Sequence, residues 1–300
     1  MNEDFQNKNH KAGFVSIVGK PNAGKSTLMN ALVGEKLSIV TSKAQTTRHR
    51  ILGIVNGEDF QIIYSDTPGI IKASYQLQQH MMSFVSLSLV DSDVVLLVVD
   101  MKDPYEADNT IDKLKNNESP VLVILNKTDL VTAVELEQHT KFWQELINPT
   151  RIIPVSALNA INIDTVFDTI LEFLPLHPPF YEKDTLTDRP ERFFAAEVVR
   201  EKIFKNYKKE VPYSTEVVIS EFKESENIIR MRAEIYVERQ TQKGIIIGKN
   251  GEAIKKVGIQ AREDLEKFFE KQVYLETFVK VEEDWRKRES VLRKFGYKQD

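Results

Sequence analysis

The sequence of 300 residues contains no cysteine. A chain without thiols can form neither a disulfide framework nor a metal site built on cysteine, and this composition fits a reducing compartment such as the cytoplasm. There is also no run of 18 or more apolar residues, so we expect no transmembrane helix. Residues 1–12 are polar and lack an apolar core, so we expect a disordered leader there rather than a secretory signal.

The formal net charge of -4 at pH 7 hides a difference between two parts of the chain. Residues 191–300 carry 24 Lys and Arg against 21 Asp and Glu, whereas residues 1–190 carry 17 against 24. This asymmetry predicts that the two parts meet different partners, although it is too small to identify them.

Short apolar runs alternate with helical patterns over residues 13–175. The runs predict strands buried on both faces, near 14–18, 60–64, 94–99, 121–125 and 152–155. The patterns between them predict helices near 25–33, 76–90, 107–116, 133–148 and 162–174. Such alternation is typical of an α/β domain with a doubly wound, mostly parallel sheet. A strand near 50–55, followed by Asn56 and Gly57, predicts a hairpin that adds an antiparallel edge.

A second pattern begins after residues 176–190, which contain prolines and little periodicity and which we expect to form a linker. Residues 191–300 predict a smaller α+β domain in the order helix, strand, strand, helix, helix, strand. The expected helices lie near 191–208, 241–248 and 251–269, and the expected strands near 213–222, 228–238 and 271–281. A last helix is expected near 284–295.

A glycine-rich loop joins the first expected strand to the first expected helix. It has the spacing G-x-x-x-x-G-K-S, in which backbone N–H groups and the helix N-terminus cradle phosphates. Lys25 is predicted to reach the β- and γ-phosphates as a catalytic group, and the Ser26 hydroxyl to bind Mg²⁺. The alternative, a glycine turn with a solvated lysine, is disfavoured by the strand–loop–helix context. The predicted phosphate-binding residues are Gly19, Lys20, Pro21, Asn22, Ala23, Gly24, Lys25, Ser26 and Thr27.

A second loop, Asp66-Thr67-Pro68-Gly69 with Ile70 after it, ends the next buried strand. At that strand tip Asp66 can hold Mg²⁺ through water, and the Gly69 N–H can bond a γ-phosphate until hydrolysis removes it. A proline turn at a strand end is the plain alternative. Upstream, Thr47 is predicted to close on Mg²⁺ and the γ-phosphate, with Thr46 as the alternative, in a segment that is otherwise a mobile surface loop.

The base is predicted from Asn126-Lys127-Thr128-Asp129. The Asp129 carboxylate can accept hydrogen bonds from both N1–H and the N2 amino group of guanine, whereas adenine has neither donor there. Lys127 would lie along the base and ribose, and Asn126 would tie this loop to the phosphate loop. Ser156-Ala157-Leu158, at the last strand tip, would supply a backbone N–H for guanine O6. The loops together predict a site for GTP and GDP.

Ile70 stands where many Ras-like GTPases place a glutamine that orients water. Isoleucine cannot hold water, so intrinsic hydrolysis should be slow or assisted by another route. We hypothesise that the Asn22 side-chain oxygen and carbonyls of the switch loop hold K⁺ against the β–γ bridge, in the role of an arginine finger.

In the second domain, a G-x-x-G loop lies between two helical patterns. Two glycines let a backbone approach a nucleic-acid strand closely, while lysines meet its phosphates. A plain interhelical turn is the alternative, but the flanking isoleucines, helices and strands match a KH domain of the order αββααβ. The predicted RNA-binding residues are Lys243, Gly248, Lys249, Asn250, Gly251, Lys255 and Lys256. Trp285, at the start of the last expected helix, either caps the domain or helps to hold RNA.

With both halves considered, the sequence resembles the bacterial Era family of GTPases over nearly its whole length. The resemblance rests on GKPNAGKSTLMN, QTTRHR, DTPG, NKTD and SAL in the first half, and on IIIGKNGEAIKKVGIQAR and WRKRES in the second. It implies a Ras-like P-loop GTPase domain over 13–175, followed by a smaller type II KH domain within 191–300.

The resemblance also implies a role. A member of this family would bind small-subunit ribosomal RNA near its 3′ end and act in assembly of that subunit, with GTP favouring the RNA-bound arrangement and hydrolysis releasing it. It would be a cytoplasmic monomer, with peripheral attachment to the inner face of the cell membrane as a further implication. Two rivals remain from the residues: an ATP-dependent enzyme on the same phosphate loop, which Asp129 disfavours, and a regulatory GTPase whose second domain binds a protein.

Overall fold

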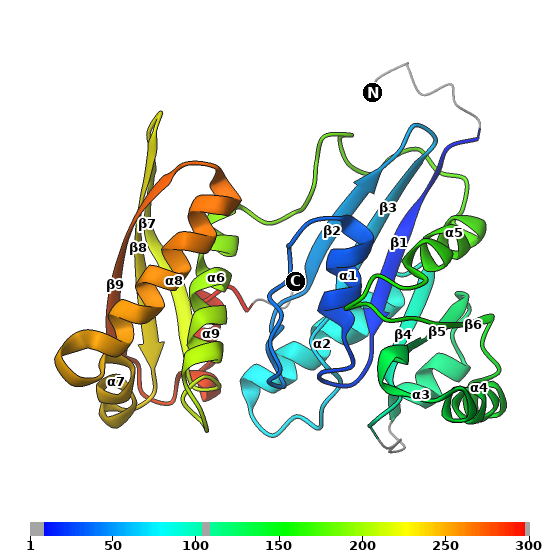
Figure 1. Ribbon diagram of the computed structural model, residues 1–300, viewed down its shortest axis with the longest axis horizontal. Helices are drawn as coiled ribbons and strands as arrows, with labels where there is room; N and C mark the ends of the chain where they lie inside the picture. Colours follow the sequence, from blue (N-terminus) through cyan, green and yellow to red (C-terminus); the bar gives the residue numbers. More distant parts are fainter. Residues whose placement is uncertain (1–8, 104–108, 298–300) are drawn as a thin grey trace. The chain divides into compact units, whose positions relative to one another are not determined.

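The computed structural model describes residues 9–103 and 109–297 (Figure 1). The chain divides into two compact units, each described here by itself. The first contains Met1–Ser38, Thr47–Lys72 and Met81–Asp188, and the second contains Ile39–Thr46, Ala73–His80 and Arg189–Asp300. The boundary near Asp188 lies close to the predicted end of the linker at residue 190. Two short segments from the first half of the sequence, however, belong to the second unit.

The first unit is built on a six-stranded sheet in the order β2-β3-β1-β4-β5-β6. Its strands pair in parallel except for β2, which runs antiparallel to β3 at the edge, as the predicted hairpin requires. The strands are β1 (Lys11–Val18), β2 (Ile51–Asn56), β3 (Phe60–Asp66), β4 (Val94–Asp100), β5 (Val121–Asn126) and β6 (Arg151–Pro154). The mostly parallel sheet predicted from the buried apolar runs is therefore confirmed.

Helices cover both faces of this sheet (Figure 1). A core cluster joins α2, α3 and α4 to the apolar side chains of β4 and β5 on one face, whereas α1 and α5 contact each other on the other. Their bounds are α1 (Lys25–Val33), α2 (Gln76–Val90), α3 (Asn109–Lys115), α4 (Ala133–Ile147) and α5 (Ile163–Phe173). Part of the helix predicted over 107–116 lies outside the described residues.

The N-terminal boundary differs from the prediction. β1 begins at Lys11, so a disordered leader reaching residue 12 is wrong. His10 is also buried, and its Nδ1 lies 2.8 Å from the carbonyl oxygen of His177. Pairing with residues far along the chain, which the local sequence does not reveal, extends the strand to Lys11.

The segment 176–190 is not a free linker, because most of it is bonded to the sheet edge. The Ile54 N–H donates to the carbonyl of Leu186 at 2.8 Å, and the N–H groups of Phe180 and Tyr181 donate to Oε1 of Gln61 at 2.7 and 3.0 Å. The edge strand β2 has one row of backbone groups without a neighbouring strand, and this segment satisfies part of that row. The segment up to Asp188 therefore belongs to the first unit.

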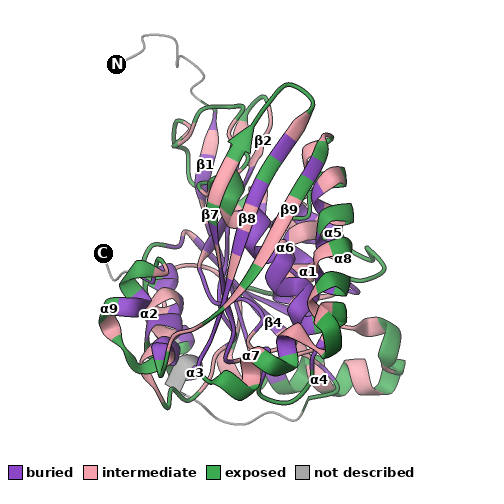
Figure 2. Cartoon of the chain, turned by 90° about the vertical axis from the view of Figure 1, so that its left-hand side faces the viewer, coloured by how far each residue is buried: buried purple, intermediate pink, exposed green. Residues whose placement is uncertain are grey.

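The second unit has the predicted order of elements around a three-stranded sheet, β7-β8-β9. β7 and β8 are antiparallel, and β8 and β9 are parallel. The elements are α6 (Glu191–Asn206), β7 (Glu216–Glu224), β8 (Ile228–Val237), α7 (Gln240–Ile247), α8 (Glu252–Phe269) and β9 (Gln272–Val281). Along most of β8, buried residues alternate with less buried ones (Figure 2), as expected for a sheet with one covered face.

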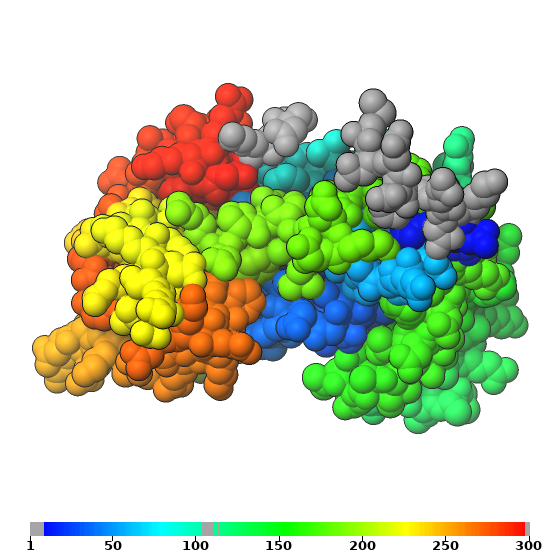
Figure 3. All heavy atoms as spheres, turned by 90° about the horizontal axis from the view of Figure 1, so that it is seen from above, coloured from blue at the N-terminus to red at the C-terminus, as the bar shows by residue number. Residues whose placement is uncertain are grey.

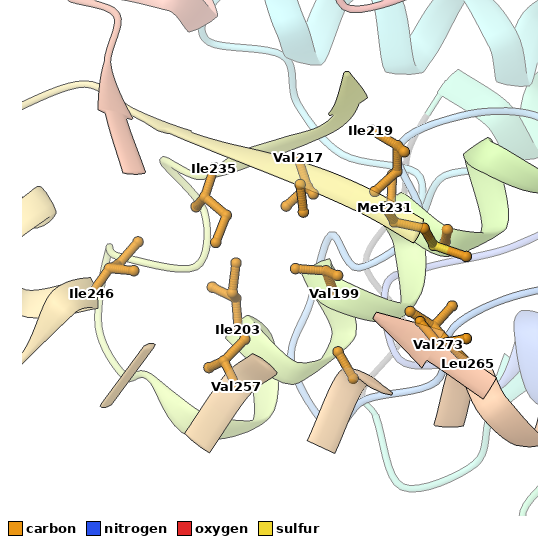
Figure 4. Packing of buried hydrophobic residues seen from close by; sticks show 14 of the residues in the cluster. Val199, Ile203, Val217, Ile219, Met231, Ile235, Ile246, Val257, Leu265 and Val273 are labelled. Atoms are coloured by element: carbon orange, nitrogen blue, oxygen red, sulfur yellow. The ribbon is translucent and has the colours of Figure 1, made fainter. Parts of the chain in front are cut away.

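The core of the second unit lies between the sheet and its helices. Val199 and Ile203 of α6 lie among strand residues such as Val217 and Ile235 (Figure 4). Val257 of α8 completes the cluster, and all five side chains are buried. This packing of one helical face against alternate strand residues follows from the periodicities that predicted the elements.

The C-terminal segment, drawn in red in Figures 1 and 3, departs from the predicted helix over 284–295. It forms a 3₁₀ turn (Trp285–Lys287) and a short helix α9 (Glu289–Lys294), separated by Arg288 in an extended conformation. Trp285 is fully buried and its Nε1–H donates to the carbonyl of Ser214 at 2.9 Å. Of the two alternatives for Trp285, the structure supports the cap on the domain, because a buried indole cannot stack on RNA.

Replacing Tyr297 by phenylalanine is expected to destabilise the second unit by about 1–3 kcal/mol. Its hydroxyl donates to Oε2 of Glu216 at 2.7 Å, and both residues are buried, so the substitution removes a bond from a desolvated carboxylate. Urea unfolding in a Trp143→Phe background, in which Trp285 is the one remaining tryptophan, measures the change by fluorescence. A loss below about 0.5 kcal/mol would show that this bond does not anchor the tail.

Candidate nucleotide site and nucleic-acid interface

The predicted phosphate loop lies between β1 and α1, which begins at Lys25. Gly19 has φ of 149° and Gly24 has φ of 97°, a region that favours glycine. A Cβ at Gly19 would lie 2.3 Å from the carbonyl oxygen of Val98, and one at Gly24 would lie 2.1 Å from Nδ2 of Asn126. Both glycines are therefore required by close approach as well as by conformation.

Lys25 points back into the phosphate loop. Its ammonium donates to the carbonyl oxygens of Gly19 at 3.0 Å and Lys20 at 2.9 Å, and only 6% of the residue is exposed. Burial lowers the pKa of Lys25 to about 8, although the nearby Asp66 carboxylate acts in the opposite direction. Phosphate oxygens that replaced the two carbonyls would supply stronger, charge-assisted acceptors.

Nucleotide affinity is expected to fall as the pH rises through about 8, the pKa of Lys25. Bound phosphates favour the charged ammonium of Lys25 and raise its pKa, so binding above that pH must take up a proton. Between about pH 7 and about pH 8.5 we expect GDP affinity to fall about fourfold, measured with a fluorescent GDP analogue. Lys25→Arg, which stays charged, should give a flat profile, and a flat profile in the wild type would contradict the account.

A cluster of three oxygen-bearing side chains lies beside this lysine. The Ser26 hydroxyl donates to Oδ2 of Asp66 at 2.7 Å and lies 2.9 Å from Oγ1 of Thr47. Asp66 is fully buried, which raises the pKa of its carboxyl, and among the described residues its Oδ1 has no hydrogen-bond partner. Two hydroxyls and an unsatisfied buried carboxylate are the hard oxygen donors that Mg²⁺ prefers, so these residues fit that ion.

The two threonines considered as Mg²⁺ ligands, Thr46 and Thr47, have different hydrogen-bond partners. Thr46 bonds within its own loop, donating to the carbonyl of Lys43 at 2.8 Å and lying 2.7 Å from the Thr41 hydroxyl. Thr47 is the one beside Ser26. The structure thus brings together the three predicted metal ligands and leaves Thr46 out.

The remaining residues of the second loop hold it against the phosphate loop. Thr67 donates from its hydroxyl to the carbonyl of Ile17 at 2.8 Å, and Ile70 donates from its N–H to the carbonyl of Gly19 at 3.0 Å. Gly69, which follows Pro68, packs so tightly that a Cβ there would lie 2.7 Å from Pro21. The Ile70 side chain packs on apolar core residues, so it offers no polar group to a water molecule.

Asn126 joins three loops at the predicted base site. Its Nδ2 donates to the carbonyl of Ala23 at 2.8 Å, and its Oδ1 accepts from the N–H groups of Lys127 at 2.8 Å and Ala157 at 3.0 Å. The Ala157 N–H is therefore already used in this geometry. Leu158, the next residue, is 80% exposed.

Asp129 is oriented by the last strand tip. Its Oδ1 accepts from the Ser156 hydroxyl at 2.5 Å, and the Thr128 N–H donates to the carbonyl of Val155 at 3.1 Å. Lys127, in contrast, pairs its ammonium with Oδ2 of Asp100 at 2.5 Å. Asp100 ends β4 and belongs to no motif, so no signal in the sequence indicated this partner.

In the second unit the predicted G-x-x-G loop lies between α7 and α8. Gly248 has φ of 71°, Asn250 of 51° and Gly251 of 78°. A Cβ at Gly248 would lie 2.6 Å from Cβ of Ala253, whereas no described residue comes within 4 Å of one at Gly251. The loop is thus a compact turn with an open outer side at Gly251.

The predicted cations surround this loop on the surface. Lys249, Lys255 and Lys256 are exposed, and Lys243 is partly exposed. Two isoleucines near the loop, which the sequence analysis did not count among the RNA-binding residues, are also exposed: Ile245 by 53% and Ile259 by 42%. A groove along α8 is lined by Glu252, Lys255, Lys256, Ile259, Gln260 and Glu263.

Comparisons with known proteins agree with both units. A family described as "50S ribosome-binding GTPase" matches residues 14–127, and a KH domain matches residues 210–286. GTPase Era of Syntrophus aciditrophicus (strain SB) is 45% identical over 291 residues, which cover 96% of this chain and 95% of that protein. The chain belongs to the Era family of GTPases.

Solved structures of Era support the same assignment. One is a structure of Era in complex with MgGDPNP and nucleotides 1506–1542 of 16S ribosomal RNA, and it is 40% identical in sequence. The match covers 97% of this chain and 100% of that Era chain, with a TM-score of 0.92. Another is a variant of Aquifex aeolicus Era bound to GDP and AlF₄⁻, which is 41% identical in sequence. That match covers 96% of this chain and 100% of the Aquifex aeolicus chain, with a TM-score of 0.92. The fold predicted from the sequence, a Ras-like P-loop GTPase domain followed by a KH domain, is confirmed by these likenesses. Within the described residues no helix is long and apolar enough to cross a bilayer.

Proposed function

We propose that this chain is a GTP-hydrolysing switch that binds small-subunit ribosomal RNA near its 3′ end through its KH domain and acts in assembly of that subunit. The proposal that the chain binds GTP rests on two hydrogen bonds that fix the predicted base-binding loop, one between Asn126 and Ala23 and one between Asp129 and Ser156. The RNA half is supported by the Era complex with 16S ribosomal RNA and by the basic GKNG loop.

Guanine selection follows from Asp129. With Oδ1 held by the Ser156 hydroxyl, the carboxylate has remaining lone pairs for the N1–H and N2 amino group of guanine. An adenine base offers no donor at either position and would leave a desolvated carboxylate unpaired. The rival ATP-dependent enzyme is disfavoured on this ground.

The phosphates and Mg²⁺ would lie between Lys25 and the oxygen cluster. Ser26 and Thr47 would coordinate Mg²⁺ directly and Asp66 through water, while Lys25 balances charge on the β- and γ-phosphates. Mg²⁺, when bound, neutralises charge that develops in phosphoryl transfer. The Gly69 N–H would bond the γ-phosphate, which couples its loss to the following loop.

Assistance to hydrolysis is assigned to Asn22, since Ile70 cannot orient water. Asn22 has φ of 62° and is exposed within the phosphate loop. That placement lets its side-chain oxygen face a cation beside the β–γ bridge. We propose K⁺ for this cation, in the role that an arginine finger has elsewhere.

GTP hydrolysis by the purified chain with Mg²⁺ tests the proposal. We expect turnover with GTP but not ATP, and a rate about tenfold higher in K⁺ than in Na⁺. Asn22→Ala should lose the K⁺ effect while GDP affinity stays within about twofold, because the base contacts are untouched. Equal rates in K⁺ and Na⁺ would reject the role of Asn22, and turnover of ATP would reject the guanine site.

The alternative function is a regulatory GTPase whose second domain binds a protein. The exposed lysines and positive-φ glycines of the GKNG loop favour RNA, because they suit a close backbone approach to phosphates. A cytoplasmic location, peripheral membrane attachment and a monomeric state stay predictions that accompany the proposed function.

A further inference from the structure

A cavity of about 290 Å³ lies in the first unit behind the phosphate loop. Three of its lining residues also belong to the predicted nucleotide site: Gly19 and Lys20 of the phosphate loop, and Ile70, which follows Gly69. The other lining residues are not among those assigned to phosphate, Mg²⁺ or guanine. The cavity is therefore distinct from the nucleotide site but shares a wall with it. Its other walls come from β4, α3 and α4.

Most of the lining is apolar and includes two aromatic rings, and Lys20, Gln138 and His139 add polar groups to it. Phe142 and Trp143 of α4 meet edge to face, with centroids 5.4 Å apart and planes at 86°. Val99 and Ile111 add aliphatic walls from β4 and α3. Apolar cavities of about 150 Å³ in proteins hold benzene, so this one has room for a two-ring aromatic.

The lining also includes hydrogen-bond acceptors. Asp100 and Asp103 both line the cavity, and Asp103 is only loosely paired with Lys20, at 3.9 Å. A carboxylate oxygen near an aromatic slot selects a ligand with an N–H or O–H donor on its ring. The lining thus fits an uncharged bicyclic aromatic that has one donor, of which indole is the simplest example.

Two contacts link the cavity to the nucleotide loops. The Gly19 carbonyl accepts from both Lys25 Nζ and the Ile70 N–H, each at 3.0 Å, so a wall of the cavity is bonded to the phosphate-contacting lysine. Asp100, in the lining, holds the ammonium of Lys127. A ligand that fixes Ile70 and Asp100 would therefore change the free energy of nucleotide binding, and nucleotide would change that of the ligand.

We propose that this cavity is a binding site for a small, uncharged bicyclic aromatic with a ring donor, and that its occupancy is linked to the nucleotide state. The linkage rests on the proposed function, because it requires that guanine nucleotides bind the neighbouring loops. The binding site itself rests only on the lining and volume of the cavity.

The test uses 5-fluoroindole with the full chain loaded with GDP and Mg²⁺, followed by ¹⁹F NMR. We expect a dissociation constant of about 1 mM or tighter, which needs only a modest binding free energy per heavy atom. Its N-methyl derivative, which lacks the donor, should bind about fivefold more weakly or worse. Exchange of GDP for a GTP analogue should change the affinity by about threefold or more.

Variants separate the cavity from other surfaces. Val99→Phe fills the cavity and should abolish binding, whereas Val134→Phe, at a position on α4 that is 64% exposed, should not. If the Val99 variant does not fold, Phe142→Ala, which removes a ring that is 39% exposed, should weaken binding about tenfold. No binding in the wild type, equal binding in the filled variant or equal affinity in both nucleotide states would overturn the proposal. GDP loading is measured separately, so its failure counts against the proposed function alone.

Discussion

Replacing Asp129 by asparagine is expected to lower GDP affinity by about a thousandfold and to create affinity for xanthosine diphosphate. The amide keeps one acceptor for N1–H but turns an N–H₂ group toward the N2 amino group of guanine, so two donors face each other. Xanthine has a carbonyl at that ring position and accepts the same amide hydrogen. The change therefore inverts the preference rather than only weakening it.

The geometry makes this substitution a clean one. Asp129 Oδ1 accepts from the Ser156 hydroxyl, and an asparagine Oδ1 can accept the same bond, so the side chain keeps its orientation. Asp168→Asn, at an exposed position on α5, removes the same charge away from the loops and should change neither affinity. Titration with fluorescent GDP and xanthosine diphosphate measures both preferences.

A loss of GDP affinity without a gain for xanthosine diphosphate would mean that Asp129 only supports the loop. Retention of GDP affinity within about tenfold would remove the basis for the guanine assignment. Either result would reopen the choice between GTP and ATP.

Replacing both Gly248 and Gly251 by aspartate is expected to lower affinity for the 3′ end of small-subunit ribosomal RNA by about a hundredfold, with GTP hydrolysis unchanged. Each new carboxylate would meet a phosphate at close range, and Gly248 has no room for a Cβ beside Ala253. Filter binding over a range of salt concentrations measures the loss. The salt dependence should also become shallower, because fewer phosphates are contacted.

Gly34→Asp is the matched control for this pair. Gly34 has φ of 83°, and in the part of the chain that the structure describes a Cβ there would meet no atom within 4 Å. It therefore shares the conformation and open space of Gly251 but lies in the first unit. It should leave RNA affinity unchanged. If the paired variant binds RNA as the wild type does, the KH loop does not hold RNA and the protein-binding alternative gains support.

The elements with strong local signals were predictable from the sequence. The predicted ranges 25–33 and 76–90 equal α1 and α2, because a glycine loop precedes the first and apolar periodicity continues unbroken through the second. The form of the C-terminal segment was not predictable from the sequence, since burial of Trp285 depends on a carbonyl of Ser214 far away in the sequence. The position of the segment 176–190 likewise depends on hydrogen bonds to the edge strand β2, which is distant in the sequence.

The candidate site shows the same division. Ser26, Thr47 and Asp66 come from motifs with known spacing, and the structure places them together. Asp100 belongs to no motif, because its role arises from the end of a strand, and the exposure of Ile259, which lies within a motif, depends on which face of its helix is covered. Such contacts are set by tertiary structure, so a single sequence cannot predict them.

The bound nucleotide is expected to control the affinity of the chain for RNA, and titration of the wild type with RNA in two nucleotide states measures that control. RNA affinity is measured with a non-hydrolysable GTP analogue and with GDP, at one salt concentration. The account predicts binding about tenfold tighter or more with the GTP analogue. Equal affinity in the two nucleotide states would contradict it.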